Sequence, residues 1–357
     1  MYPALAVARV LAAEHDEILF VGTPDGLEAR LVPEAGVVFR GLRARGFDRS
    51  RPWTLVTSSV RIAASTVTAW SWFGVDRPDA VLGFGGYVSI PVGLAAVLRG
   101  IPLVLHEQNS VPGMANRVLS RWATRVAVTY EESAELLKHP GRVVVTGNPV
   151  RDEVTRSRRD SGRRALGLPE TARVLLVFGG SRGARHLNTA LLALRTHLVA
   201  EEDLFVLHLA GTADAATVRE SLAAAGGDAD GRWRVLEYLN DMGSALAGAD
   251  LVVARAGATS IAEITALGVP AVLVPYPYAT DDHQTKNART MVSHGAAELI
   301  ADKDLDDERF GDIILGILAD AARRATMSDA SRALGRPDAA HRVVTIVHEA
   351  GAKTTRP

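Results

Sequence analysis

A glycine-rich stretch carries the clearest chemical signal in this sequence. In VLLVFGGSRGARHLN (174–188), an apolar run leads into glycines and then into a helix-forming segment. Backbone N–H groups in such a turn, together with the N-terminus of the following helix, bind phosphate groups. Gly179, Gly180 and Gly183 let a ligand approach the backbone, and Ser181 adds a hydroxyl donor. We therefore predict a phosphate site here rather than a plain strand-to-helix connection.

A row of polar residues follows another apolar run, in LHEQNSVPGMANR (105–117). His106, Glu107, Gln108 and Asn109 stand where a buried strand is expected to end. Residues at that position can orient hydroxyl groups or move a proton. The alternative is a histidine with a purely structural role, but four polar residues together favour function.

An earlier glycine turn, GFGGYVSIPVG (83–93), is largely apolar and lacks a following positive charge. Packing is therefore favoured over phosphate binding at this turn. Its Tyr87 and Ser89 suit contact with an acceptor substrate.

A third turn lies in ARAGATSIAEITALGVP (254–270), again between a strand and a helix. Ser260 and Glu263 match the S-x-x-E capping box, which predicts that Glu263 closes the first turn of the helix. The competing interpretation is that this carboxylate accepts hydrogen bonds from a ribose diol. The local sequence leaves both interpretations open.

The segment PYPYATDDHQTKNA (275–288) raises the question of a metal site. Neither its paired aspartates, Asp281 and Asp282, nor GDADG (227–231) has the spaced oxygen ligands of a calcium loop, so we expect solvated turns and no metal. Gln284 and Asn287 lie one helical turn apart, a spacing suited to binding sugar hydroxyls.

Short apolar runs alternate with amphipathic stretches along the whole chain, which predicts parallel sheets covered by helices on both faces. We expect an α/β protein of two doubly wound domains, with ligands bound beyond the carboxyl ends of the strands. The domains are expected at 1–150 and 151–335, with part of the charged stretch 150–172 as the connection. A terminal helix at 336–357 is expected to pack back on the first domain.

Bulk composition narrows the class of protein. The chain has 357 residues, a net charge of −1 and no cysteine. The charge argues against nucleic-acid binding, and the lack of thiols excludes a disulfide framework. We expect neither a membrane span nor a signal peptide, and therefore a cytoplasmic protein.

The start of the chain is unusual for an α/β protein. Pro3 and the spacing of Leu5, Val7 and Val10 predict that the first element is a helix, followed by a strand at 17–22. A doubly wound sheet normally has a central strand before its first helix. We therefore expect the helix to be the second element of the native fold, and the loss of that strand to leave its neighbours unpaired.

Taken in order, several stretches resemble the MurG family of peptidoglycan synthesis. They are PALAVA, GFGGYVS, LHEQN, GNPVR, GGSRGAR, RAGATSIAE and DDHQTKNA, and they span nearly the whole chain. The resemblance implies a GT-B fold and a hexosyltransferase. The reaction would be an inverting transfer of N-acetylglucosamine from UDP-N-acetylglucosamine to the 4-hydroxyl of the muramoyl sugar of lipid I, forming lipid II, without a metal or cofactor.

The same resemblance implies roles for individual residues. Ser181 would contact the diphosphate, Arg151 the nucleotide side, and the backbone at Leu239 the uracil edge. Asn109 and Gln284 would hold the transferred sugar. The segment that borders phosphate and ribose, with Glu263 on the diol, comprises Ala258, Thr259, Ser260, Ile261, Ala262 and Glu263.

The general base is where this chain departs from the family pattern. Members carry a GGTGGH loop directly before the PALA helix, and its histidine is the usual candidate base. Met1 stands at the position after that histidine. Among the residues present, Glu107, His106 and Tyr87 are the remaining candidates for catalysis, and the activity of the chain as written is an open question.

Lipid I is anchored in a bilayer, so the resemblance also implies a peripheral protein on the cytoplasmic face of the cell membrane. The stretch 51–75 offers a candidate apolar patch with a sparse basic rim, and a core helix is the alternative. The residues of this patch are Trp53, Leu55, Val56, Trp70, Trp72 and Phe73, with Arg51 and Arg61 nearby.

Two other functions compete with this one. A truncated relative could bind the UDP-sugar without catalysis. Another GT-B enzyme, such as a natural-product glycosyltransferase or a UDP-N-acetylglucosamine 2-epimerase, is the second alternative, against which the GGYVS and HEQN stretches argue.

Overall fold

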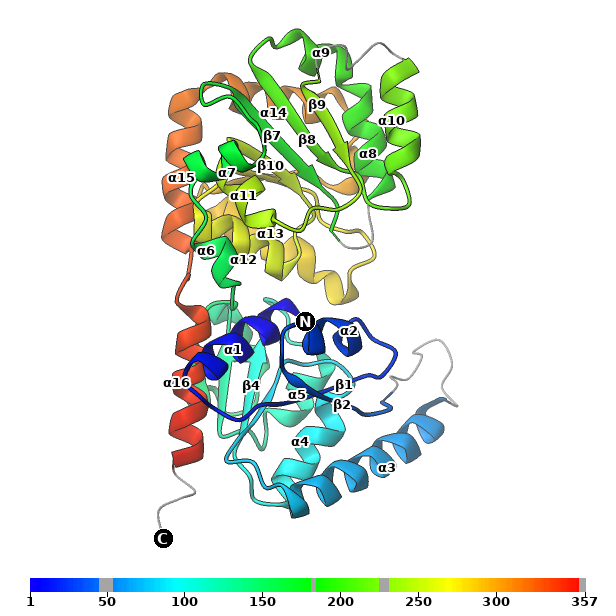
Figure 1. Cartoon of the computed structure of the whole chain (residues 1–357), viewed down its shortest axis with the longest axis vertical. Helices are drawn as coiled ribbons and strands as arrows, with labels where there is room; N and C mark the ends of the chain where they lie inside the picture. The colour runs from blue at the N-terminus through cyan, green and yellow to red at the C-terminus, as the bar shows by residue number, and fades with distance from the viewer. Residues whose placement is uncertain (45–53, 181–183, 225–230, 353–357) are drawn as a thin grey trace. The chain divides into compact units, whose positions relative to one another are not determined.

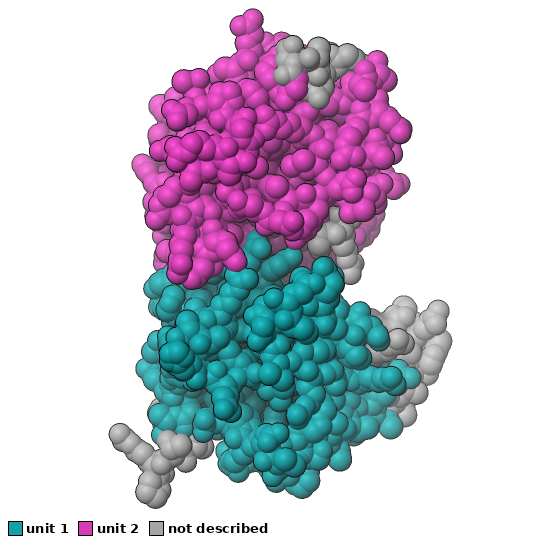
Figure 2. All heavy atoms as spheres, in the orientation of Figure 1, with its two compact units in different colours: residues 1–151, 338–357 teal, residues 152–337 magenta. Residues whose placement is uncertain are grey.

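The chain folds into two compact units. The computed structural model describes residues 1–44, 54–180, 184–224 and 231–352, without the side chains of 54–57. Unit 1 comprises Met1–Arg151 and Asp338–Pro357, and unit 2 comprises Asp152–Pro337 (Figure 2). The boundary between them therefore lies at the start of the charged stretch 150–172, and the rest of that stretch packs within unit 2.

Unit 2 is built on a six-stranded parallel sheet in the order β12-β11-β10-β7-β8-β9 (Figure 1). Its strands are β7 (Arg173–Phe178), β8 (Leu204–Leu209), β9 (Trp233–Leu236), β10 (Leu251–Ala254), β11 (Ala271–Leu273) and β12 (Ala297–Leu299). Its helices are α6 (Asp152–Thr155), α7 (Arg159–Ala165), α8 (Arg185–Ala193), α9 (Arg195–Ala200), α10 (Ala215–Ala224), α11 (Met242–Gly248), α12 (Ala258–Leu267), η3 (Thr280–Asp282), α13 (His283–Ser293), η4 (Asp302–Asp304), α14 (Glu308–Ala319) and α15 (Ala321–Leu334). The edge strand β12 was not predicted, because three residues are too short to show a pattern.

The strand order of unit 2 creates a switch point between β7 and β10. From β7 the chain moves outward through β8 to β9, and it then returns to β10 on the other side of β7 before continuing to β11 and β12. The last residues of the two strands, Phe178 and Ala254, are paired in register. In open α/β sheets this is the place where ligands bind, because loops that leave in opposite directions open a crevice there.

Unit 1 has two parallel sheets, β1-β2 and β3-β4-β5-β6. Its strands are β1 (Leu19–Gly22), β2 (Val38–Gly41), β3 (Val81–Gly83), β4 (Leu103–Glu107), β5 (Arg125–Val128) and β6 (Val143–Val145). Its helices are α1 (Tyr2–Ala13), α2 (Glu28–Glu34), α3 (Thr54–Val75), α4 (Ser89–Leu98), α5 (Met114–Leu119), η1 (Glu131–Leu136), η2 (Pro140–Arg142) and α16 (Ala339–Ala352).

Helices cover both faces of the larger sheet of unit 1. On β4, Leu103 and Leu105 belong to a core cluster with residues of α3, α4 and α5, whereas Val104 belongs to a cluster with α1 and α16. This alternation follows from the period of two along a strand. The near-continuous apolar run at 101–105 is therefore explained by a strand buried on both sides, as the sequence predicts.

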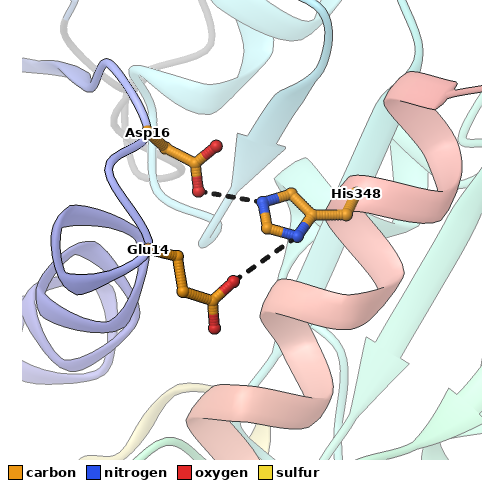
Figure 3. A group of neighbouring side chains, drawn as sticks. All are labelled: Glu14, Asp16 and His348. Atoms are coloured by element: carbon orange, nitrogen blue, oxygen red, sulfur yellow. Dashed lines mark hydrogen bonds and ion pairs between the residues drawn. The ribbon is translucent and has the colours of Figure 1, made fainter.

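The C-terminal helix α16 packs against α1 of the same unit. At the surface, His348 of α16 lies between two carboxylates that follow or end α1 (Figure 3). Its Nε2 is 2.9 Å from Asp16 and its Nδ1 is 3.6 Å from Glu14. Because each ring nitrogen faces its own carboxylate, the contacts of His348 connect α16 to the end of α1.

The two sheets of unit 1 are separate. In the described part of the chain, β1 pairs only with β2, and the ladders of β3 to β6 do not extend to either strand. The expectation of a further central strand before Tyr2 predicts a break of this kind, because such a strand would pair on both edges. The strand itself stays an expectation.

Candidate functional site

The glycine turn after β7 leads into helix α8. Gly180 has a φ of +82°, in the left-handed region that glycine tolerates and other residues rarely adopt. Gly179 precedes it at the end of the strand, and Ser181 and Gly183 lie outside the described residues. Helix α8 begins after Ala184, whose side chain offers no cap to its first N–H groups. Those donors are the ones expected to bind an anion.

A second helix begins beside this turn, after the adjacent strand β10. Gly257 is the N-terminal cap residue of α12, and it too has no side chain to satisfy the first N–H groups. Two helix N-termini therefore follow the carboxyl ends of neighbouring strands at the switch point. This arrangement favours a ligand with two linked anionic groups.

The predicted capping box on α12 is wrong. The helix starts at Ala258, so Ser260 is its third residue and Glu263 its sixth, too far inside to close the first turn. Glu263 is nevertheless 6% exposed. Of its neighbours, Ala258 and Ile261 are buried, and Thr259, Ser260 and Ala262 are half-buried. The capping interpretation is therefore excluded, and contact of Glu263 with a ribose diol stays a prediction.

Helix α13 contributes the amides predicted to bind a sugar. Gln284 is half-buried, and its Oε1 accepts a hydrogen bond from the backbone N–H of Tyr276 at 2.9 Å. Asn287 is buried and its Nδ2 lies 3.4 Å from the carbonyl oxygen of Ala256, in the turn before α12. Asn287 thus supports the turn, while Gln284 stays a candidate for sugar binding.

The remaining residues predicted in this region are exposed or half-buried. Asp281 and Asp282 form an exposed turn, both with a φ of +53°, and Asp282 accepts a hydrogen bond from Thr285. Leu239 is half-buried in the segment after β9. GDADG (227–231) lies outside the described residues except for Gly231.

In unit 1, His106 is fully buried on β4. Gln108 donates to its Nδ1 at 3.1 Å, and its Nε2 donates to the carbonyl oxygen of Gly147 at 3.0 Å. Burial lowers the pKa of His106 to about 4, so the ring is neutral at pH 7. Both ring nitrogens are used inside the protein, which gives His106 a structural role.

Glu107, the next residue, organises the loop that follows β4. Its Oε1 accepts from the backbone N–H of Asn109 at 3.0 Å, and its Oε2 accepts from the N–H of Gly113 at 2.9 Å and from Asn116 at 2.8 Å. The side chain is buried. The carboxylate therefore holds the loop that carries Asn109, which is itself half-buried.

Two further candidates in unit 1 are more accessible. Tyr87 is 53% exposed, the most accessible of the three residues predicted for catalysis. Arg151 is half-buried, and its guanidinium carbon lies 4.8 Å from the centre of the Tyr2 ring. This cation–π contact fixes the arginine against the first helix.

Comparison with known proteins assigns the chain to a family. Residues 1–128 match the glycosyltransferase family 28 N-terminal domain, and residues 174–343 match the C-terminal domain of that family. The chain is 43% identical over 353 residues to a UDP-N-acetylglucosamine–N-acetylmuramyl-(pentapeptide) pyrophosphoryl-undecaprenol N-acetylglucosamine transferase of Desulfitobacterium hafniense, covering 97% of this chain and 95% of the relative. A crystal structure of Acinetobacter baumannii MurG matches with a TM-score of 0.77 and 30% identity over 98% of this chain and 95% of that one.

The chain belongs to the MurG family. This confirms the family predicted from the sequence motifs and the GT-B fold that they imply. The fold is also shared more widely. A crystal structure of a UDP-N-acetylglucosamine 2-epimerase matches with a TM-score of 0.69 but only 17% identity, over 100% of this chain and 94% of that one. That likeness shows the fold alone, so it does not favour the epimerase alternative.

Within this MurG fold, a charged network that no sequence motif indicated lies at the switch point. Arg255 directly follows β10 and is paired with Asp302 of η4, which also contacts His186 of α8. No local pattern marks these residues, because the partners lie far apart in the chain. The one signal in the sequence is that these residues stand near the ends of predicted strands and helices.

We expect replacement of Glu107 by glutamine to destabilise this MurG protein. The amide nitrogen of the glutamine is a donor and would face the donors that the carboxylate now accepts from. A buried donor would be left unsatisfied, which costs about 1 to 3 kcal/mol of folding free energy. The midpoint of thermal unfolding should fall by about 2 to 12 °C, measured by calorimetry. If Glu107 acted only as a base, the variant would lose turnover while its melting temperature stayed unchanged.

Proposed function

We propose that this chain transfers N-acetylglucosamine from UDP-N-acetylglucosamine to the 4-hydroxyl of the muramoyl sugar of lipid I, forming lipid II with inversion. The observation that carries the proposal is the similarity of the chain, over 97% of its length, to a protein named for this transfer. The geometry agrees with it, because α8 and α12 begin at the switch point of the unit 2 sheet and their cap residues, Ala184 and Gly257, make no side-chain cap hydrogen bond.

Unit 2 is proposed to bind the donor. The N–H groups after Gly179 and Gly180 and at the start of α12 would hold the diphosphate, with Ser181 and Gly183 contributing from the turn. Glu263 would accept hydrogen bonds from the ribose diol, and the backbone at Leu239 would meet the uracil edge. Gln284 would contact the transferred sugar.

The transfer reaction has two catalytic requirements. The acceptor hydroxyl must lose a proton as it attacks the anomeric carbon, and the departing diphosphate must be stabilised. Oriented N–H groups and helix N-termini supply positive partial charge for the second task, so the scheme uses no metal or cofactor.

Unit 1 is proposed to bind the acceptor. By the roles that the resemblance implies, Asn109, held by Glu107, would contact hydroxyls of the transferred sugar, and Arg151 would contact the nucleotide side. Of the three candidates for the base, His106 and Glu107 are committed to hydrogen bonds inside the unit, whereas Tyr87 is accessible.

The test is a transfer assay with radiolabelled UDP-N-acetylglucosamine and a lipid I analogue, run beside calorimetric titration with the donor alone. We expect donor binding and a labelled disaccharide lipid. Binding without product would support the truncated, non-catalytic alternative, and no binding at all would overturn the proposed donor site.

We also propose that this protein works at the cytoplasmic face of the cell membrane. None of the described helices is long and apolar enough to cross a bilayer, so contact would be peripheral. The candidate is α3, a helix of 22 residues along one side of unit 1 (Figure 1). Its exposed apolar residues include Val60, Val67, Trp70 and Val75, and Leu98 of α4 is also exposed.

The predicted membrane patch needs correction at one residue. Phe73 is buried in the core of unit 1, and Trp72 packs partly against the same core, because α3 turns one face toward α4. Trp70 is 42% exposed, with the Arg99 guanidinium 3.6 Å from its ring centre. Arg51 and Trp53 lie outside the described residues, as do the side chains of Leu55 and Val56.

Placing charge on this helix should weaken membrane contact. We expect the double variant Val60→Glu/Val67→Glu to bind vesicles of phosphatidylglycerol and phosphatidylethanolamine about tenfold more weakly in a cosedimentation assay, because two exposed apolar side chains are lost. Ala322→Glu/Thr326→Glu, on the exposed face of α15, is the matched control. Equal loss in both variants would point to net charge rather than to α3.

A further inference from the structure

One carboxylate in unit 2 links both helix N-termini of the proposed donor site. Asp302 lies 2.9 Å from Nδ1 of His186 and 2.5 Å from Nη1 of Arg255. The other ring nitrogen of His186 lies 3.1 Å from Asp306. We call these four residues, His186, Arg255, Asp302 and Asp306, the η4 network.

The network connects the segments that flank the switch point. His186 is the second residue of α8, and Arg255 lies two residues before Gly257, the cap residue of α12. Arg255 is buried and also lies within hydrogen-bonding distance of the carbonyl oxygens of Val274 and Pro275 after β11. Asp302 thus ties the start of α8 to a turn that is already fixed against the neighbouring strand.

We propose that the η4 network acts as a protonation-dependent brace. When His186 is protonated, the ion pairs of the network hold the N-termini of α8 and α12 at a fixed spacing, and this raises the affinity of the chain for the diphosphate of the UDP-sugar. This inference rests on the proposed donor site. A site that is already ordered before binding loses less conformational entropy when the ligand binds. His186 and Asp302 act here as positioning residues, because they work through the backbone donors rather than on the substrate.

The charge state of His186 decides whether the brace is complete. The hydrogen bond to Asp302 raises the pKa of His186 above its ordinary value, as does the bond to Asp306, although burial opposes the shift. Burial also disfavours ionised Asp302, but its bonds to His186 and Arg255 hold its pKa below the usual range. The ion pairs are therefore complete at pH 6 and are lost as the pH rises through the raised pKa of His186.

Among the described residues, the charged groups that interact with His186 are its two carboxylate partners on and after η4. On its own helix, the neighbouring Arg185 is paired with Asp214, and from the β10 side Arg255 faces Asp302. Protonation of His186 thus responds to Asp302 and Asp306, with Arg255 acting through Asp302.

The test is calorimetric titration of the full chain with UDP-N-acetylglucosamine at pH 6 and pH 9. The UDP-sugar is preferred to UDP, whose terminal phosphate titrates at about pH 6. Because the ion pairs are partly exposed, we expect His186→Gln to bind about two- to fivefold more weakly than the unmodified protein at pH 6, with a ratio of about one at pH 9. Asp306→Asn should move the midpoint of the affinity change to lower pH.

His294→Gln is the matched control, because His294 is exposed at the end of α13 and lies close to Thr290 and Ser293 of the same helix. It should bind like the unmodified protein at both pH values. Equal affinity of His186→Gln and the unmodified protein at pH 6 would overturn the brace while leaving the donor site intact. A weakening that is the same at both pH values would also overturn it. Absence of binding by the unmodified protein would instead overturn the proposed function.

Discussion

Replacing Glu263 with glutamine is expected to lower kcat/KM for sugar transfer about ten- to hundredfold, mainly through a higher KM for the UDP-sugar. The carboxylate is 6% exposed on α12, and the start of this helix shows that it is not needed as a cap. Hydrogen bonds to a charged group contribute about 1.5 to 3 kcal/mol, which corresponds to this loss. Steady-state kinetics with varied donor concentration measures the effect.

A modified donor tests whether the ribose is the partner of Glu263. With 2′-deoxyribose in the UDP-sugar, the unmodified protein should lose about as much kcat/KM as the variant loses with the normal donor. Combining the variant with the modified donor should add little, because the same interaction is removed twice. Fully additive losses would place the partner of Glu263 elsewhere. Glu298→Gln, which alters a half-buried carboxylate on the edge strand β12, is the control and should transfer normally.

The fold was predictable because its strands are buried on both faces. Runs such as VLLVF in β7 and LVL in β4 are apolar at consecutive positions, and parallel sheets covered by helices produce that pattern. The pattern fails where a strand lies at the edge and is short. Ala297–Leu299 has only three residues, one of them charged, and nothing in its composition distinguishes it from a loop.

A candidate site could be proposed from the sequence only where one segment contains the whole signal. The glycine turn after β7 is such a segment. The capping box was misleading because the S-x-x-E spacing occurs inside α12 rather than at its start, where Gly257 serves as the cap residue. Pairs such as Glu107 with Asn116 and Arg255 with Asp302 depend on how distant residues meet, which local spacing does not encode.

The charged stretch 150–172 shows the limit of composition as a guide. Its density of charge suggested that part of it connects the two domains, yet Arg163 on α7 is 1% exposed and packs within unit 2. Its guanidinium donates to the carbonyl oxygens of Gly248, Pro169 and Glu170 and to Asp250. Asp250 in turn accepts from the backbone N–H of Val174 at the start of β7. One buried ion pair thus joins α7, the end of α11 and the first strand of the sheet.

We therefore expect Asp250→Asn to be among the most destabilising single changes in unit 2. It leaves the Arg163 charge buried without its carboxylate, and breaking a buried pair in this way costs about 3 to 5 kcal/mol. The midpoint of thermal unfolding should fall by about 6 to 20 °C, as measured by calorimetry with and without UDP-N-acetylglucosamine to identify the transition of unit 2.

The control for this prediction is Asp203→Asn, which breaks an ion pair with Arg173. The Asp203 side chain of that pair is 53% exposed. Such pairs contribute about 0 to 1 kcal/mol, so its effect on the melting temperature should be small. The double variant Arg163→Met/Asp250→Asn should lose less than the sum of the two single variants, because removing the arginine also removes the unpaired charge. Simple additivity would mean that the hydrogen bonds of Arg163 to the three carbonyl groups, rather than its pairing with Asp250, hold α7 to the sheet.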